Sequence, residues 1–194
     1  MPSDSTSTRV RRDILRARVY AAEDQWTAML DRGGQVDFFG SALVVAPQRR
    51  FADIPAMQRY VDRVLDLDTV RARFPDLPGV RLRERRGQRR AHYACPDPVI
   101  AIPTGELWAG RESVLLHELA HHVRCCGFAD ASWAGHSKGF VATMVWLVEA
   151  AMGPEQALLL TASLSASGVV PRAADAASSE RECRNDSGGP SRGC

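Results

Sequence analysis

Residues 114–123 read Val-Leu-Leu-His-Glu-Leu-Ala-His-His-Val, so that His117 and His121 stand four positions apart and Glu118 follows the first of them. The surrounding apolar residues favour a helix, and helical side chains four positions apart project from the same side. Both imidazoles can therefore reach one point about 2 Å from each nitrogen, which is the bond length between Zn²⁺ and histidine. The segment predicts an α-helix that supplies two ligands of a zinc site.

Glu118 lies one step further round the same helix. From there its carboxylate does not easily become a third ligand, but it can take the proton of a water molecule held by the ion, and zinc lowers the pKa of such a water. The alternative is a core helix with incidental histidines. Burying two imidazoles beside a carboxylate without metal would leave polar groups in need of partners, at about 1–3 kcal/mol each. We therefore favour a metal site with Glu118 as its catalytic base.

A catalytic zinc site takes three protein ligands and keeps one position open. The segment 135–140, Gly-His-Ser-Lys-Gly-Phe, leads into a strongly apolar helical stretch, and its His136 is the predicted third ligand. The start of a helix holds a side chain rigidly while letting it point outward. Glu149, Asp130 or a cysteine are the alternatives.

Four further residues could belong to the same site. Cys125 and Cys126 are expected to be buried or to cap the helix, because a closed thiolate site would leave Glu118 without a role. His122 projects about 100° away from His121 on a helix, so we expect it at the surface or supporting the ligands. His92 is expected to be an ordinary strand histidine, with an oxyanion or substrate contact in the cleft as the alternative.

Composition describes one domain. The chain has 194 residues and a net charge of +2, and we expect a folded domain at residues 9–170 between disordered segments at 1–8 and 171–194. The apolar runs are shorter than the ~20 residues of a membrane span, and no apolar signal core follows the N-terminus, so a cytoplasmic protein without membrane contact is expected. The five cysteines are odd in number and unevenly spaced, which argues against a disulfide framework.

Periodicity predicts the other elements, and together they indicate an α+β fold with a small, mostly antiparallel sheet packed on helices. The predicted elements are a cover helix at 10–30, strands at 36–39 and 43–45, a helix from Asp53 and Pro55, a hairpin formed by 80–85 and 89–94, a strand at 99–102 and a last helix at 154–165. The strand at 99–102 precedes the histidine helix closely. It is expected either as an ordinary core strand or as the sheet edge to which an extended peptide adds.

The His-Glu-Leu-Ala-His motif at 117–121, the Gly-His-x-x-x-Phe element at 135–140 and the helix Val-Ala-Thr-Met-Val-Trp-Leu-Val-Glu that follows carry a resemblance. They resemble an actinobacterial family of small HExxH-containing metallohydrolases, itself similar to SprT-like minimal zincins. The resemblance covers about residues 9–170, most strongly 99–154. It implies a compact zincin-like metallopeptidase domain, zinc held by His117, His121 and His136, Glu118 as base, and a peptide or protein substrate. The Ser-Lys-Gly at 137–139 departs from the Gly-Pro-Glu-like turn expected of the family, which concerns local geometry rather than the ligands.

The segment 80–94 is rich in arginine and suggests a second function. Its basic residues are Arg81, Arg83, Arg85, Arg86, Arg89 and Arg90. Such a patch can contact phosphates, and SprT-like proteases as a family act on DNA-bound proteins. The near-neutral chain and the single aromatic Tyr93 argue against nucleic acid, and a solvated edge hairpin is the simpler interpretation. The sequence therefore favours a zinc metallopeptidase over its alternative, a metal-stabilised binding module that contacts nucleic acid or a protein partner through this segment.

Overall fold

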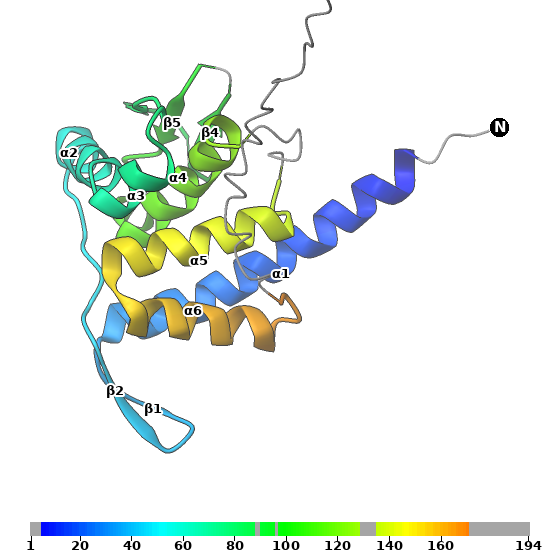
Figure 1. Cartoon of the computed structure of the whole chain (residues 1–194), viewed down its shortest axis with the longest axis vertical. Helices are drawn as coiled ribbons and strands as arrows, with labels where there is room; N and C mark the ends of the chain where they lie inside the picture. The colour runs from blue at the N-terminus through cyan, green and yellow to red at the C-terminus, as the bar shows by residue number, and fades with distance from the viewer. Residues whose placement is uncertain (1–4, 88–89, 96, 129–134, 171–194) are drawn as a thin grey trace, which may run out of the picture.

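The structure is a computed structural model that describes residues 5–87, 90–95, 97–128 and 135–170, with backbone only for 5–14. Its mixed helices and small sheets confirm an α+β protein (Figure 1). In chain order the elements are α1 (Ser5–Arg32), β1 (Gly34–Phe38), β2 (Ser41–Val45), α2 (Ile54–Leu65), α3 (Asp68–Arg73), β3 (Arg81–Glu84), β4 (His92–Ala94), β5 (Val99–Ile102), the short 3₁₀ helix η1 (Leu107–Gly110), α4 (Glu112–Cys126), α5 (Lys138–Met152) and α6 (Pro154–Ala166).

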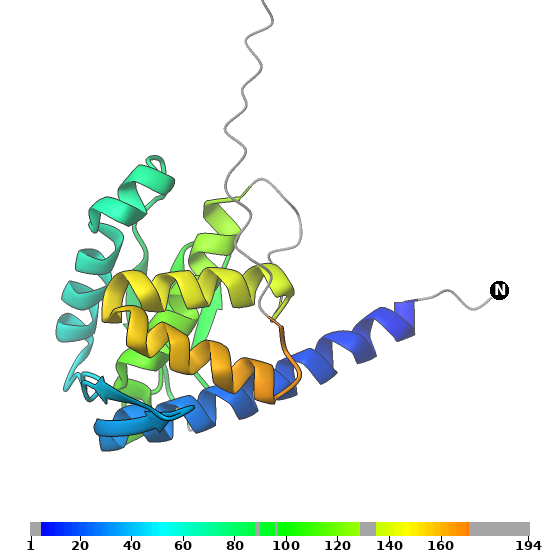
Figure 2. The same ribbon diagram turned by 60° about the horizontal axis from the view of Figure 1, so that its bottom comes forward.

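The helices α1, α5 and α6 lie side by side, and α4 packs between α5 and the edge strand β4 (Figures 1 and 2). Trp26 of α1 is fully buried in this layer, and its indole N–H donates a hydrogen bond to the Gln156 carbonyl at the start of α6, at 3.0 Å. The predicted cover helix is therefore present. Its backbone is helical from Ser5 onward. Residues 1–4 and 171–194 lie outside the described residues.

The three-stranded sheet has the order β3-β5-β4, with β3 parallel and β4 antiparallel to β5. The predicted hairpin is therefore wrong, because β3 and β4 do not pair with each other. Of the two alternatives for 99–102, the core strand is confirmed, since β5 is the central strand. The physical reason is that all four residues of β5 are apolar and buried, and a strand buried on both faces belongs in the middle of a sheet. Among the described residues, the free edge next to α4 is that of β4.

The predicted strands at 36–39 and 43–45 form the hairpin β1–β2, which pairs from Gly34 opposite Val45 to Phe38 opposite Ser41. Its turn residues Phe39 and Gly40 have φ angles of 51° and 80°. A type I′ hairpin turn needs positive φ at both positions, which explains the glycine. The hairpin projects from the body of the molecule, away from α4 (Figure 1).

Local capping fixes the helices that border the histidines. The Asp53 side chain accepts a hydrogen bond from the Ala56 N–H at 2.7 Å and starts α2, as predicted from Asp53 and Pro55. The Ser137 hydroxyl accepts from the Phe140 N–H at 3.2 Å and starts α5. His136 therefore stands directly before a helix cap, which holds its backbone in place. The sequence analysis did not predict α3.

A disulfide bond joins Cys95, after β4, to Cys125, in the last turn of α4. The expectation that the cysteines form no disulfide, with Cys125 a buried or capping thiol, is wrong for this pair. The two residues are 30 positions apart in the sequence and meet only because β4 packs against α4, so cysteine spacing gave no sign of it. Cys126 is a free thiol.

Among the described helices, none is both long and apolar enough to cross a membrane.

We expect Cys95→Ser to lower the free energy of unfolding by about 3–4 kcal/mol, because a cross-link that closes a loop of this length restricts the unfolded chain. Urea denaturation of the oxidised protein measures the effect. Cys126→Ser is the matched control, since it removes a neighbouring sulfur that bridges nothing, and it should change stability by less than about 1 kcal/mol. Equal losses in the two variants would contradict the role given to the bond.

Candidate metal centre

The structure brings together the three histidines that the sequence singled out. His117 and His121 come from the middle of α4, and His136 comes from the residues just before α5. One nitrogen of each ring lies within 4.8 Å of the others, in an arrangement that could hold a metal ion. The side chains of His117 and His136 are nearly inaccessible to solvent, with 6% and 8% of their residue surface exposed.

The spacing of two of the nitrogens is compatible with a shared metal ion. The Nε2 atoms of His117 and His136 face each other at 3.2 Å. Two nitrogens that each lie about 2.05 Å from a tetrahedral ion are separated by about 3.3 Å. The His117 Nδ1 already contacts a carboxylate, which leaves its Nε2 as a lone pair directed at the cluster. The residues present therefore fit a metal ion.

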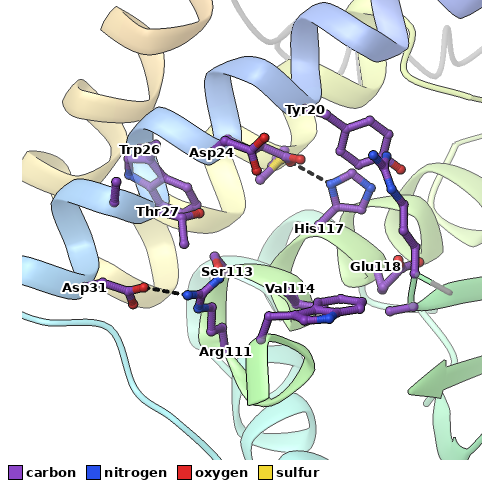
Figure 3. Close-up of a pocket in the computed structure, with 16 residues that line it drawn as sticks. Tyr20, Asp24, Trp26, Thr27, Asp31, Arg111, Ser113, Val114, His117 and Glu118 are labelled. Atoms are coloured by element: carbon purple, nitrogen blue, oxygen red, sulfur yellow. Dashed lines mark hydrogen bonds and ion pairs between the residues drawn. The ribbon is translucent and has the colours of Figure 1, made fainter. Parts of the chain in front are cut away.

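The carboxylate is that of Glu23 on α1, whose Oε1 lies 2.6 Å from the His117 Nδ1, 94 positions away in the sequence (dashed line in Figure 3). A histidine that binds a metal through Nε2 donates its Nδ1–H to a carboxylate or carbonyl, which fixes the ring and makes the ligand more basic. The sequence analysis missed this residue. Its only local sign is a carboxylate directly after the buried Ala22 of the cover helix.

The electrostatic environment keeps two of the rings neutral. Burial lowers the pKa of His121 to about 2, with the charges of His117 and His136 adding to the effect. Burial and the His117 charge lower the pKa of His136 to about 3. Burial alone would lower the pKa of His117 too, but the charge and hydrogen bond of Glu23 outweigh it and raise that pKa. Neutral imidazoles have the free lone pairs that a metal needs.

Glu118 is buried beside these rings, with 6% of its surface exposed. Burial raises its pKa, and the nearby His117 charge and the Tyr93 backbone N–H oppose that rise only in part. A carboxylate with a raised pKa binds a proton more readily, which suits a general base. Glu118 is absent from the metal-binding cluster, in agreement with the expected division of roles.

Two connected cavities open at this centre. The main cleft, of about 370 Å³, runs between α1, η1 and the start of α4 (Figure 3). The metal pocket, of about 200 Å³, contains the three histidines. Five residues line both cavities: Tyr20, Arg90, Ala91, His117 and Glu118. The base and one predicted ligand therefore lie where the cavities meet.

Aromatic rings lock the imidazoles in place. Phe140 of α5 stacks on His121, with ring centroids 4.3 Å apart and planes at 28°. Tyr20 of α1 stacks on His117 at 5.5 Å and 15°. These contacts, together with Glu23, leave the rings of α4 little freedom to turn.

The positions of His122 and His92 differ from those expected from the sequence. His122 is not at the surface: it is fully buried, its Nε2–H donates to the Pro78 carbonyl at 2.8 Å, and its Nδ1 accepts from the Tyr93 hydroxyl at 3.2 Å. The helix rotation that turns it away from His121 points it into the protein core, where it supports packing and not the ligands. His92 lines the metal pocket, so the alternative of a cleft residue describes it better than an ordinary strand position.

The alternative third ligands do not join the cluster. Glu149 is exposed on α5 and lies outside the group of converging donors, and Cys125 is in the disulfide. Asp130 lies outside the described residues. The arginine segment is divided: Arg81 and Arg83 are exposed on β3, and Arg90, which is also exposed, lines the cleft. The hairpin that was expected to carry these arginines on one face is not formed, since β3 and β4 do not pair; Arg89 lies outside the described residues.

Glu23→Gln should weaken zinc binding by roughly 10–100-fold, because Gln keeps the size of the side chain but not the charge that orients and polarises His117. Competition with a chromophoric chelator measures the dissociation constant. Asp24→Asn is the matched control, since Asp24 is the next residue of α1 and also lines the cleft but lies outside the histidine cluster. Equal zinc affinity in wild type and Glu23→Gln would refute this role for Glu23.

The chain matches no protein-family model, no curated protein sequence and no solved structure. The case for a function therefore rests on the residues of the site and their geometry.

Proposed function

We propose that this protein is a zinc-dependent metallopeptidase that cleaves a peptide bond in a peptide or protein substrate. The observation that carries the proposal is the convergence of His117, His121 and His136 beside the buried carboxylate of Glu118, in a pocket that shares His117 and Glu118 with the main cleft. A structural zinc site has four protein ligands and needs no base. Three ligands, a base and a cleft are the components of a hydrolytic site.

Zinc is the metal that this donor set fits best, since three imidazole nitrogens suit a borderline-soft divalent ion. When bound, zinc would lower the pKa of water and polarise the scissile carbonyl. The residues of the chain supply the other steps. Glu118 accepts the proton of the attacking water and passes it to the leaving amine as the C–N bond breaks. Glu23 holds the His117 ring in the orientation that this arrangement needs.

A peptide substrate is supported by the strand that borders the site. β4 is paired with β5 along one side, and its other edge has no strand partner among the described residues. His92 of this strand lines the metal pocket. An extended chain that adds to such an edge gains backbone hydrogen bonds and is held along the cleft. This is the role that the sequence analysis considered for the strand at 99–102, and we now assign it to β4.

Elemental analysis tests the proposal first. Protein purified without an affinity tag should carry about one zinc ion per chain, and His136→Ala should lose most of it. His92→Ala is the control, because it removes an exposed imidazole from the same pocket but from outside the cluster. A wild-type protein that takes up no zinc even after zinc is added back would refute the metallopeptidase.

A further inference from the structure

Arg90 occupies the junction of the main cleft and the metal pocket, together with Glu118 and His117. Its guanidinium carbon lies 3.5 Å from the centre of the Tyr20 ring. Tyr20 in turn stacks on His117 and lies 4.9 Å from His136, measured between ring centroids. The Arg90 carbonyl accepts a hydrogen bond from the Arg85 guanidinium at 3.1 Å, which ties down the backbone at this point. The arginine is therefore held over the metal-binding residues by an aromatic ring.

Among the described residues, no acidic side chain forms an ion pair with Arg90. Arg111, which lines the same cleft, binds Asp31 at 2.8 Å, whereas within the described ranges Arg90 forms no salt bridge. A cation this close to a site for another cation weakens metal binding. Arg90 is exposed, so water solvates its charge in the free protein and its N–H groups are available to an anion that binds at the junction of the two cavities.

We propose that Arg90 is a catalytic residue that binds the oxyanion formed from the scissile carbonyl, a role that rests on the proposed peptidase function. When the water oxygen attacks the carbonyl carbon, the π electrons of the C=O bond move onto its oxygen, and Glu118 takes the water proton. The guanidinium N–H groups donate to that negative oxygen. When the C–N bond breaks, the carbonyl re-forms and the proton goes to the amine. Arginine suits this role because it stays charged and presents several donors in a rigid plane.

Two small ligands of the metal separate this role from metal binding itself. Methylphosphonate is a tetrahedral oxyanion, like the group that forms during hydrolysis. Acetohydroxamate chelates the metal through a planar group. Cobalt-substituted protein is titrated with each, and the visible absorption of the cobalt reports binding without any need for a substrate. Arg90→Gln should weaken methylphosphonate binding at least tenfold and change acetohydroxamate binding less than twofold.

The control is Arg83→Gln, which removes the same charge from the exposed surface of β3, and it should bind both ligands as the wild type does. Arg90→Lys keeps the charge but loses the planar donors, so its affinity for methylphosphonate should lie between that of the wild type and that of Arg90→Gln. On any peptide that the wild type cleaves, Arg90→Gln should lower kcat by about 10²–10³-fold with little change in KM.

The failures of the two proposals are distinguishable. If the wild type binds no cobalt, the metal site and the peptidase both fail, and the role of Arg90 falls with them. If cobalt binds but Arg90→Gln weakens both ligands alike, or neither, the metal site stands and the oxyanion role is overturned. An Arg83→Gln variant that loses methylphosphonate as strongly as Arg90→Gln would also overturn it, because the effect would then be general electrostatics.

Discussion

Glu118→Gln should keep its zinc and its fold and lose hydrolysis by roughly 10²–10⁴-fold, the usual contribution of a general base. Gln has the shape of Glu but takes up no proton at neutral pH. The carboxylate is buried and its pKa is raised, chiefly by burial, so water does not easily replace it as a proton acceptor. Cleavage of fluorescein-labelled casein measures the loss of hydrolysis. Elemental analysis measures the retained zinc, and a thermal melt measures the retained fold.

Glu149→Gln is the matched control for that measurement. Glu149 is exposed on α5, was itself an alternative third ligand, and lies outside the cluster, so its replacement should change neither zinc content nor rate. If Glu118→Gln cleaved casein as fast as the wild type, Glu118 would not be the base. If the wild type bound zinc but cleaved no substrate in a broad peptide screen, the metal-stabilised binding module would become the better interpretation.

The parts of the site that follow from local geometry could be predicted from the sequence. The spacing of His117 and His121 places both rings on one side of a helix whatever the rest of the chain does. His136 was predicted from its position before an apolar helix, and the Ser137 cap now explains why its backbone is fixed. These relations span a few residues, so periodicity and capping rules are sufficient to find them.

The parts that depend on contacts between distant segments could not be predicted. Glu23 reaches His117 across 94 positions, and Cys95 meets Cys125 across 30. Neither pairing leaves a local pattern, because each exists only once α1 and β4 pack against α4. Arg90, the oxyanion residue proposed here, could not be recognised for the same reason: its place beside Tyr20 at the cleft depends on the packing of α1, and the sequence shows it only as one of several arginines in the segment 80–94.

The sheet shows a different kind of error, in which the local pattern was visible but misread. The strands β3 and β4 are neighbours in the sequence with a glycine between them, and this proximity favoured a hairpin. The continuous apolar run of β5 carried the stronger information, since every residue of it is buried. A strand of that kind lies between two others, and its insertion separates β3 from β4. The sheet edge proposed for the substrate is therefore that of β4, because β5 is paired on both sides.

Zinc should raise the melting temperature strongly, and His121→Ala should abolish that rise. At free zinc about a thousand times its dissociation constant, binding to the folded state adds about 4 kcal/mol of stability. In a domain of this size, each kcal/mol shifts the melting temperature by about 2–4 °C, so the expected rise is roughly 8–16 °C. Differential scanning calorimetry with excess zinc and with a chelator measures it.

For each variant, the melting temperature with zinc is compared with the melting temperature of the same variant without zinc. The difference excludes the stability that the substitution itself removes by loss of packing. That matters for His121, whose ring stacks on Phe140, so that the alanine variant will melt lower in any case. His92→Ala, which removes a histidine from the same pocket but not from the cluster, should keep the full zinc-dependent rise. If His121→Ala kept it as well, the three converging imidazoles would not be the site that zinc occupies, and the metal would have to bind elsewhere on the chain.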